Sequence, residues 1–207
     1  SVVAAPGRGE VDYLSPCGVV ARAGGDMLYV AEKTAEQVAA FDVRSGKVTE
    51  TFSLTGRPTG LVLRPGADRL LVTCGGARGK LYSIALPGGK LESAVPVGHT
   101  PLSPVVGPDG DIAYVCNRFD DSVSVVDLEG ERQVDVVTVR REPMAAALSP
   151  DGRFLFVANH LPTGSAQSGY VSAAVSVVDT REGGVVENIG LPDGSTEQVR
   201  TKDDVKA

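Results

Sequence analysis

The sequence predicts an all-β protein of the β-propeller class, and three observations carry this prediction. One apolar pattern returns four times at a nearly constant step. A turn sequence containing Gly precedes each copy of the pattern, with Pro at its start in the last three copies, and valine is abundant throughout. No long segment shows the 3.6-residue periodicity of helices. We therefore expect four blades, each an antiparallel sheet of four strands, around a common axis.

The repeat is clearest in a trio of apolar residues. The trio ends at Val30, Val72, Val115 and Val157, so successive copies are 42, 43 and 42 residues apart. This step matches the roughly 40–45 residues of a four-stranded propeller blade. Leucine-rich repeats are shorter, and helical repeats of similar length require a helical periodicity that this sequence lacks.

Each repeat predicts the same series of elements: strand, turn, strand, loop, strand, turn, strand. The strand before the turn begins at Pro58, Pro101 or Pro143 in the last three repeats. The predicted boundaries are an N-terminal extension (1–16), four blades (17–54, 55–97, 98–139 and 140–191), and a tail or the start of a missing blade (192–207). Residues 11–14 are a candidate for an additional edge strand.

Composition restricts the class of partner. The chain has 207 residues, a formal charge of -6 and a pI near 5.0, and its basic residues are scattered, which argues against a nucleic-acid partner. No apolar stretch approaches the ~18 residues of a membrane helix, so no membrane span is expected. The three cysteines, Cys17, Cys74 and Cys116, have no CxxC spacing. We expect buried or semi-buried free thiols rather than a disulfide framework or a structural zinc site.

Two repeats share a longer motif. Asp-Gly-x-x-x-x-Val, then Ala-Asn or Cys-Asn, then Val-Ser-Val-Val-Asp, occurs in 108–117 with 123–127 and in 150–159 with 175–179. This motif resembles the YVTN-type repeat of bacterial propellers, whereas the absence of Trp excludes the Trp-Asp signature of WD40 blades. The first two repeats depart from it, with Glu32 and Cys74 at the position of Asn117 and Asn159. The resemblance implies a ring of about seven blades and a periplasmic or secreted location.

Segments 98–101, 116–119, 141–143 and 159–162 resemble a narrower subgroup of secreted bacterial propellers. In that subgroup the propeller is often joined to, or encoded beside, cytochrome c peroxidase-like domains. The haem-attachment motif CxxCH does not occur here, so any haem would lie on another domain or chain. We therefore predict no cofactor for this chain, and docking of a c-type cytochrome remains one hypothesis.

Four blades leave two sheet edges open, which favours pairing with another chain. Three arrangements are compatible with the sequence. The chain is a fragment of a longer protein with further C-terminal blades, or two copies complete one ring as a homodimer, or four blades close alone.

The topology gathers polar residues on one face of the ring. In a propeller the first strand of each blade lines the axis, so the loops after the second and fourth strands share a face. Both histidines and the longest insertion, 161–172, fall on this face. The predicted ligand-binding residues are Arg57, His99, Asn117, Arg118, Arg140, Arg141, Asn159 and His160.

These residue types suit a protein partner or an anionic small ligand, because arginine pairs with carboxylate and phosphate in a bidentate manner. The alternative is that the arginines are solvated loop residues and that Asn117 and Asn159 satisfy turn backbone. Two histidines without nearby carboxylates make a poor metal centre, so no metal is predicted.

The leading functional hypothesis is a non-catalytic, extracytoplasmic binding scaffold, and no catalytic residue is predicted. Cys116 and His160 form a possible thiol–imidazole pair across neighbouring blades, but Cys116 continues a strand and is expected to pack between blades. The alternative is a propeller enzyme domain, lactonase-like or dehydrogenase-like, with Glu32 and Glu142 as its main carboxylates. The recurrent Asp42, Asp127 and Asp179 indicate a structural role in a turn.

Overall fold

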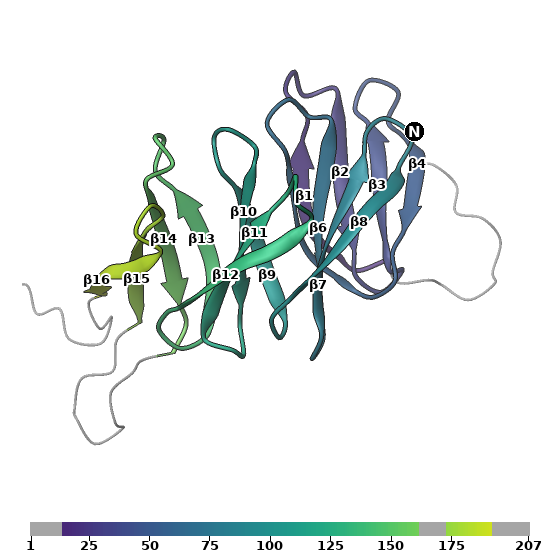
Figure 1. The fold of residues 1–207 in the computed structure, drawn as a ribbon. Coiled ribbons are helices and arrows are strands. Elements are labelled where there is room, and N and C mark those ends of the chain that lie inside the picture. Colours follow the sequence, from purple (N-terminus) through teal and green to yellow (C-terminus); the bar gives the residue numbers. More distant parts are fainter. Residues whose placement is uncertain (1–13, 162–172, 192–207) are drawn as a thin grey trace, which may run out of the picture.

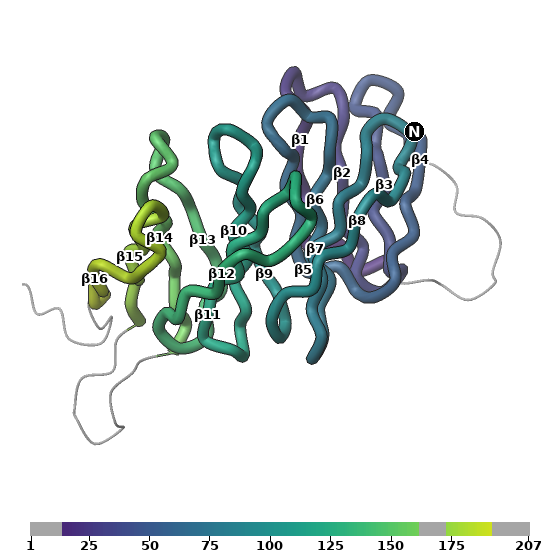
Figure 2. The backbone as a smooth tube through the Cα atoms, viewed as in Figure 1, coloured from purple at the N-terminus to yellow at the C-terminus, as the bar shows by residue number. Residues whose placement is uncertain are grey.

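The computed structural model describes residues 14–161 and 173–191, and every regular element in these ranges is a β-strand. The strands form four antiparallel sheets, and each sheet is a meander of four consecutive strands. Figure 1 shows the sheets following one another in an arc, from purple at the N-terminal end to yellow. The backbone trace in Figure 2 follows the same path. This architecture is the predicted series of propeller blades.

The first two blades have similar strand lengths. Blade 1 contains β1 (Pro16–Ala21), β2 (Met27–Glu32), β3 (Gln37–Asp42) and β4 (Lys47–Ser53). Blade 2 contains β5 (Pro58–Leu63), β6 (Arg69–Cys74), β7 (Gly79–Ala85) and β8 (Lys90–Val97). The opening strand β1 was not delimited from the sequence, yet it begins at a proline like β5.

The last two blades repeat this plan. Blade 3 contains β9 (Pro101–Val106), β10 (Ile112–Asn117), β11 (Ser122–Asp127) and β12 (Arg132–Thr138). Blade 4 contains β13 (Pro143–Leu148), β14 (Phe154–Asn159), β15 (Ala174–Asp179) and β16 (Gly184–Gly190). Residues 11–13 of the candidate edge strand, residues 162–172 of the insertion and the tail 192–207 lie outside the described residues, and Leu14 belongs to no strand.

The register repeats from blade to blade. Val30, Val72, Val115 and Val157 are each the fourth residue of a six-residue second strand. The third and fourth strands of every blade also share one irregularity, a register shift between the fourth and fifth residues of β3, β11 and β15 and at the corresponding place in β7. Because the bulge recurs with the sequence, each repeat specifies its own twist.

The cores lie between the blades. Valines and leucines on one side of a sheet pack against the facing side of the next, as when Leu71, Leu81 and Val95 of blade 2 meet Val115 and Val126 of blade 3. Both sides of an interior sheet are therefore buried, which explains the nearly continuous apolar runs of the second strands.

The inner strands of successive blades are also joined by hydrogen bonds. The Cys17 thiol donates to the Pro58 carbonyl at 3.2 Å, and the Ser103 hydroxyl donates to the Met144 carbonyl at 3.0 Å. The Thr59 hydroxyl donates to the Pro101 carbonyl in the same way. These bonds hold β1, β5, β9 and β13 side by side along the axis.

The two ends of the arc expose positions that are buried in its interior. Phe156 of blade 4 is 38% exposed, whereas Tyr114, the same position in blade 3, is 8% exposed. At the other end Val43 of blade 1 is 45% exposed, whereas its blade 3 counterpart Leu128 is 6% exposed. Each terminal sheet thus lacks, among the residues described, the neighbour that covers an interior sheet.

Candidate functional site

The loops that carry the predicted site residues are joined by backbone hydrogen bonds. The backbone N–H of Arg118, in the loop after β10, donates to the Thr100 carbonyl at 3.2 Å. The N–H of His160, after β14, donates to the Glu142 carbonyl at 2.9 Å. Loops after second strands therefore lie against loops after fourth strands, and we call their common surface the loop face.

Five side chains form a continuous series of contacts on the loop face, from the loop between blades 2 and 3 to the loop after β14. We call them the loop cluster: His99, Arg118, Phe119, Glu142 and His160. Nε and Nη2 of Arg118 donate to Oε2 of Glu142 at 3.1 and 2.8 Å. The guanidinium carbon of Arg118 lies 4.8 Å from the centre of the Phe119 ring, and His99 meets the ring edge-on at 5.2 Å. His160 Nδ1 lies 3.6 Å from Oε2 of Glu142.

Two aspartates shape the backbone beneath the loop cluster. Asp120 accepts a hydrogen bond from the His99 N–H at 2.7 Å, and Asp121 accepts one from the Glu142 N–H at 2.8 Å. Glu142 itself has a φ of 53°, which non-glycine residues adopt only where surrounding contacts hold it. The loop from Asn117 to Ser122 therefore determines where the Glu142 carboxylate lies.

Charge neighbours affect the Glu142 carboxylate. Hydrogen bonds from Arg118 lower the pKa of Glu142 below its ordinary value, and a further contribution comes from His160. Partial desolvation opposes this shift. The carboxylate is thus ionised at neutral pH and compensates much of the Arg118 charge.

The two predicted asparagines are buried rather than presented to a ligand. Asn117 is 1% exposed; its amide nitrogen donates to the hydroxyls of Ser122 and Ser124, and its amide oxygen accepts from the Gly98 N–H. Asn159 is 3% exposed and its nitrogen donates to the Val157 carbonyl and other acceptors of blade 4. Both side chains fix the start of the loop, which fits the alternative given for them above.

The remaining predicted arginines are distributed along the arc. Arg57 lies in the loop between blades 1 and 2 and pairs with Glu36 at 3.9 Å. Arg140 and Arg141 lie in the loop between blades 3 and 4, where the Arg140 N–H donates to Ser176 Oγ at 3.4 Å and Arg141 is exposed. The structure thus brings Arg118, Arg140, Arg141, His99 and His160 to one loop region, whereas Arg57 belongs to another.

The groups considered for catalysis have structural partners. Cys116 is fully buried among blade 3 and blade 4 residues, and burial raises its pKa to about 12, while His160 pairs with Glu142. Glu32 is buried and accepts a hydrogen bond from Gln37 Nε2 at 2.6 Å. Within 14–161 and 173–191, no three His, Cys, Asp or Glu side chains are grouped as a metal site would require.

The recurrent aspartates cap turns. Asp42, Asp127 and Asp179 accept hydrogen bonds from backbone N–H groups two to three residues later, in the turn between the third and fourth strands.

In the part of the chain that the structure describes, no helix is long and apolar enough to cross a membrane.

Phe119 is the residue of this cluster that sequence reasoning did not select. It is 52% exposed although its large ring is apolar, and it follows Arg118 in a polar loop. An aromatic residue next to an arginine, outside any strand, is the signal that identifies it.

The structure contains two further pockets, one beside the loop face and one along the inner strands. One, of about 400 Å³, lies beside Asn117 and Asp120 and is lined by residues of β8, β11 and β12. Another, of about 320 Å³, lies along the inner strands and includes Cys17, Thr59 and Ser103.

Comparison with known proteins supports the fold only. No protein-family model matches the chain, and no curated protein matches it. Among the solved structures that match is a chain of "Kuenenia stuttgartiensis Hydrazine Synthase", with a TM-score of 0.78 and 21% sequence identity over 89% of this chain. The fold is that of a β-propeller. The propeller described here spans about half (51%) of the length of that chain, and at this level of identity the likeness does not extend to its activity.

Proposed function

We propose that this chain is a non-catalytic binding module of an extracytoplasmic β-propeller and that its loop face contacts a protein partner. The observation that carries the proposal is Phe119, an exposed aromatic ring held between His99 and Arg118. Aromatic and arginine side chains contribute most of the binding energy at protein interfaces. Holding the ring in place before binding reduces the entropy that association costs.

The charge balance of the loop cluster favours a protein over a small anion. Arg118 already donates twice to Glu142, so a small anion would have to compete with a carboxylate for the same guanidinium. A protein surface instead covers Phe119 and leaves the Arg118–Glu142 pair intact at its edge, while exposed Arg141 adds electrostatic attraction. An acidic or amphipathic patch is the surface that fits.

The extracytoplasmic location and the YVTN repeat type rest on the sequence motif in blades 3 and 4. The location is tested by fractionating cells that produce the full-length natural protein from its own gene. Recovery in the periplasm or medium supports the proposal, and recovery with cytoplasmic markers contradicts it.

The binding face is tested by site-specific photo-crosslinking in the source organism. A photo-reactive residue replaces Phe119 in one variant and Val186, an exposed residue of the outer strand β16, in a control. We expect a discrete protein adduct at position 119 that weakens when Arg141→Glu is added. Equal adducts at both positions, or none at 119, would refute the assignment. A haem-containing adduct partner would identify the cytochrome-docking form of the proposal.

A further inference from the structure

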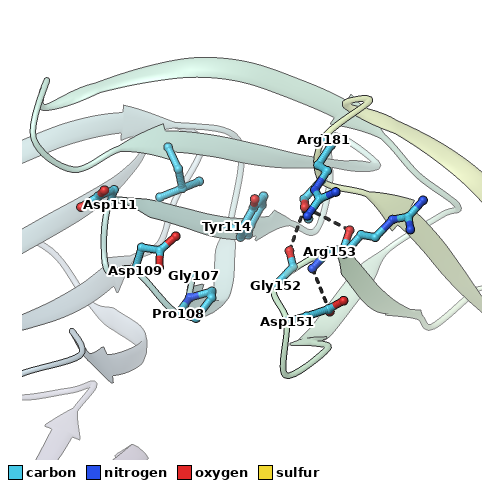
Figure 3. Close-up of a pocket in the computed structure, with 11 residues that line it drawn as sticks. Gly107, Pro108, Asp109, Asp111, Tyr114, Asp151, Gly152, Arg153 and Arg181 are labelled. Atoms are coloured by element: carbon cyan, nitrogen blue, oxygen red, sulfur yellow. Dashed lines mark hydrogen bonds between the residues drawn. The ribbon is translucent and has the colours of Figure 1, made fainter.

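The face opposite the loop cluster carries a separate pocket between blades 3 and 4. It has a volume of about 310 Å³, and its walls include Gly107, Asp109 and Tyr114 of blade 3 and Gly152, Thr180 and Arg181 of blade 4. In Figure 3, Asp109 and Asp111 lie on one side of Tyr114, and Arg153 and Arg181 lie on the other. The volume is at the lower end of the range for small-molecule sites.

The corresponding groove between blades 2 and 3 is filled by the protein itself. Arg64 reaches across it, where Nε donates to the Gly110 carbonyl at 2.8 Å and Nη2 donates to Glu129 at 2.9 Å. Asp111 lies 3.6 Å from the same guanidinium. The Arg64 side chain is only 14% exposed, so it closes the groove and neutralises its acids.

Around the pocket between blades 3 and 4, three positions differ in charge or side-chain size from their equivalents around the groove between blades 2 and 3. The repeat places Gly107 where blade 2 has Arg64, so no side chain crosses the groove. Blade 4 has Arg153 and Arg181 where blade 3 has Asp111 and Glu129. The acceptors that hold an internal guanidinium in one groove are thus replaced by guanidinium groups in the next.

The walls of the pocket are also more polar than those of the groove between blades 2 and 3. Leu71 and Leu128 pack in the apolar core between blades 2 and 3, and their counterparts beside the pocket are Tyr114 and Thr180, which both carry hydroxyls. The Thr180 hydroxyl donates to the Gly152 carbonyl at 2.8 Å. The equivalent carbonyl in blade 3, that of Gly110, accepts its hydrogen bond from Arg64 instead. Packing of Gly152 against Pro108 keeps the two blades close, because a Cβ on Gly152 would lie 2.7 Å from Pro108 Cδ.

The two arginines differ in availability. Nε of Arg153 lies 3.4 Å from Asp179 and its guanidinium stacks on Phe154, and Figure 3 shows its side chain extending away from Tyr114. Arg181 is exposed, and among the described residues it makes no ion pair within 4.0 Å. Arg181 is therefore the donor that can turn to a ligand without leaving an ion pair, and the Tyr114 hydroxyl, which has a hydrogen bond with Thr180, lines the same pocket.

We propose that this pocket binds a small molecule through one anionic oxygen group, a carboxylate or a phosphate, held by Arg181 on the wall that also carries Tyr114 and Thr180. In the groove between blades 3 and 4, the anionic group takes the place that the Arg64 guanidinium has in the equivalent groove between blades 2 and 3, with the charges of protein and occupant exchanged. The other lining acids, Asp109, Asp111 and Asp151, disfavour a second negative charge, and those on the wall opposite Arg181 accept a donor group of the ligand.

The test is a titration of the isotope-labelled chain with inorganic phosphate and, separately, with acetate at constant ionic strength, followed by backbone amide NMR. We expect saturable shifts confined to residues such as Gly107, Gly152 and Arg181, and the probe that saturates at lower concentration identifies the anion class. Shifts that increase linearly with both probes, or that spread over the loop face, would overturn the proposal.

Matched variants separate the site from general electrostatics. Arg181→Glu should weaken binding about tenfold or more, since a charge-assisted hydrogen bond is lost and repulsion is added. Arg44→Glu changes the exposed arginine at the equivalent turn position of blade 1 and should leave binding unchanged. Equal weakening by both variants contradicts the proposal.

A second variant tests the groove itself. Gly107→Arg combined with Arg181→Glu reproduces the Arg64–Glu129 arrangement, and a Cβ at Gly107 meets only the Ile112 carbonyl, at 3.5 Å. We expect this double variant to fold with an unchanged or higher Tm and to lose anion binding. Retained binding in the folded double variant would place the anion elsewhere.

Discussion

Blades 3 and 4 carry equivalent residues on the side of the sheet that faces the C-terminal end of the arc. In blade 3 these residues are core, because blade 4 covers them, whereas in blade 4 they are surface. Val137 of blade 3 is 6% exposed, and Ile189, its counterpart in blade 4, is 42% exposed. Cys116 is fully buried, whereas Ala158 at the same position is exposed. The sequence of each repeat provides for a neighbour on both sides, and the neighbour alone decides which residues become core.

This comparison shows how to locate function in a repeat protein. Positions that recur between blades, such as the valines of the second strands and the turn aspartates of blades 1, 3 and 4, serve packing and turns. Positions where neighbouring blades diverge, such as Phe119 on one face and Gly107 on the other, carry features that packing does not require.

The largest expected effect compares Tyr114→Ala with Phe156→Ala, the same repeat position in blades 3 and 4. Tyr114 packs against Leu155 and Val157 of blade 4, so its truncation should lower the free energy of unfolding by about 3 kcal/mol or more. Phe156 lacks such a cover, and its truncation should cost about 1 kcal/mol or less. Urea denaturation measures both. An equal loss would mean that another blade or chain covers Phe156 in solution.

A smaller difference is expected between Asn117→Ala and Asn159→Ala. Asn117 satisfies both amide atoms, including an acceptor bond from the Gly98 N–H, and its loss should cost about 1–3 kcal/mol. The amide oxygen of Asn159 has no hydrogen-bond partner among the described residues, so Asn159→Ala should cost less. The same urea denaturation decides the order, and the reverse order would contradict the hydrogen-bond assignment of these loops.

The reactivity of the three thiols should differ between the inner strand β1, which carries Cys17, and the blade interfaces, which bury Cys74 and Cys116. Burial raises the pKa of both Cys74 and Cys116 to about 12, while Cys17 on the inner strand β1 is exposed and its pKa is raised by partial desolvation. A disulfide reagent at pH 8 should therefore label one thiol in the native protein and three in denaturant. Cys17→Ser should abolish the native reaction. Rapid native labelling of Cys116 would show that blades 3 and 4 separate readily.

The smallest effect is the pH dependence of the loop cluster. Because hydrogen bonds from Arg118 lower the pKa of Glu142 in the folded state, this carboxylate stabilises the fold above the ordinary pKa of a glutamate. The contribution is lost as the pH falls through the lowered folded-state value. Glu142→Gln should remove this part of the acid sensitivity, and Glu187→Gln, at an exposed carboxylate of β16, is the control. Identical pH profiles of Tm for the wild type and Glu142→Gln would contradict the pairing.

The fold was predictable because each blade encodes it separately. The prolines at 58, 101 and 143 begin strands where the sequence predicts them, and the equal step places four valines in register. The strand β1 was less evident, since Pro16-Cys17-Gly18 contains few strand-forming residues before Val19. Its pairing with β2 rather than its own composition stabilises it.

The candidate site was predictable only in part. Topology alone assigns His99, Arg118 and His160 to one face, because loops after second and fourth strands must share it. The burial of Asn117 depends on the hydroxyls of Ser122 and Ser124, which lie beside it only once the register of β10 and β11 is known. The pocket at Gly107 is open because glycine has no side chain to fill it. The sequence alone does not show this, since the role of the equivalent Arg64 in closing its groove is visible only in three dimensions.

Hydrogen–deuterium exchange of the backbone amides tests most directly whether neighbouring blades determine stability in this arc. Units that contact only their neighbours are stabilised chiefly across their interfaces. The amides of β6 and β10, covered on both sides, should exchange most slowly, and those of β14 and β15 should exchange faster because one side of blade 4 is open. Equal protection in all four blades, or slowest exchange in blade 4, would contradict the account.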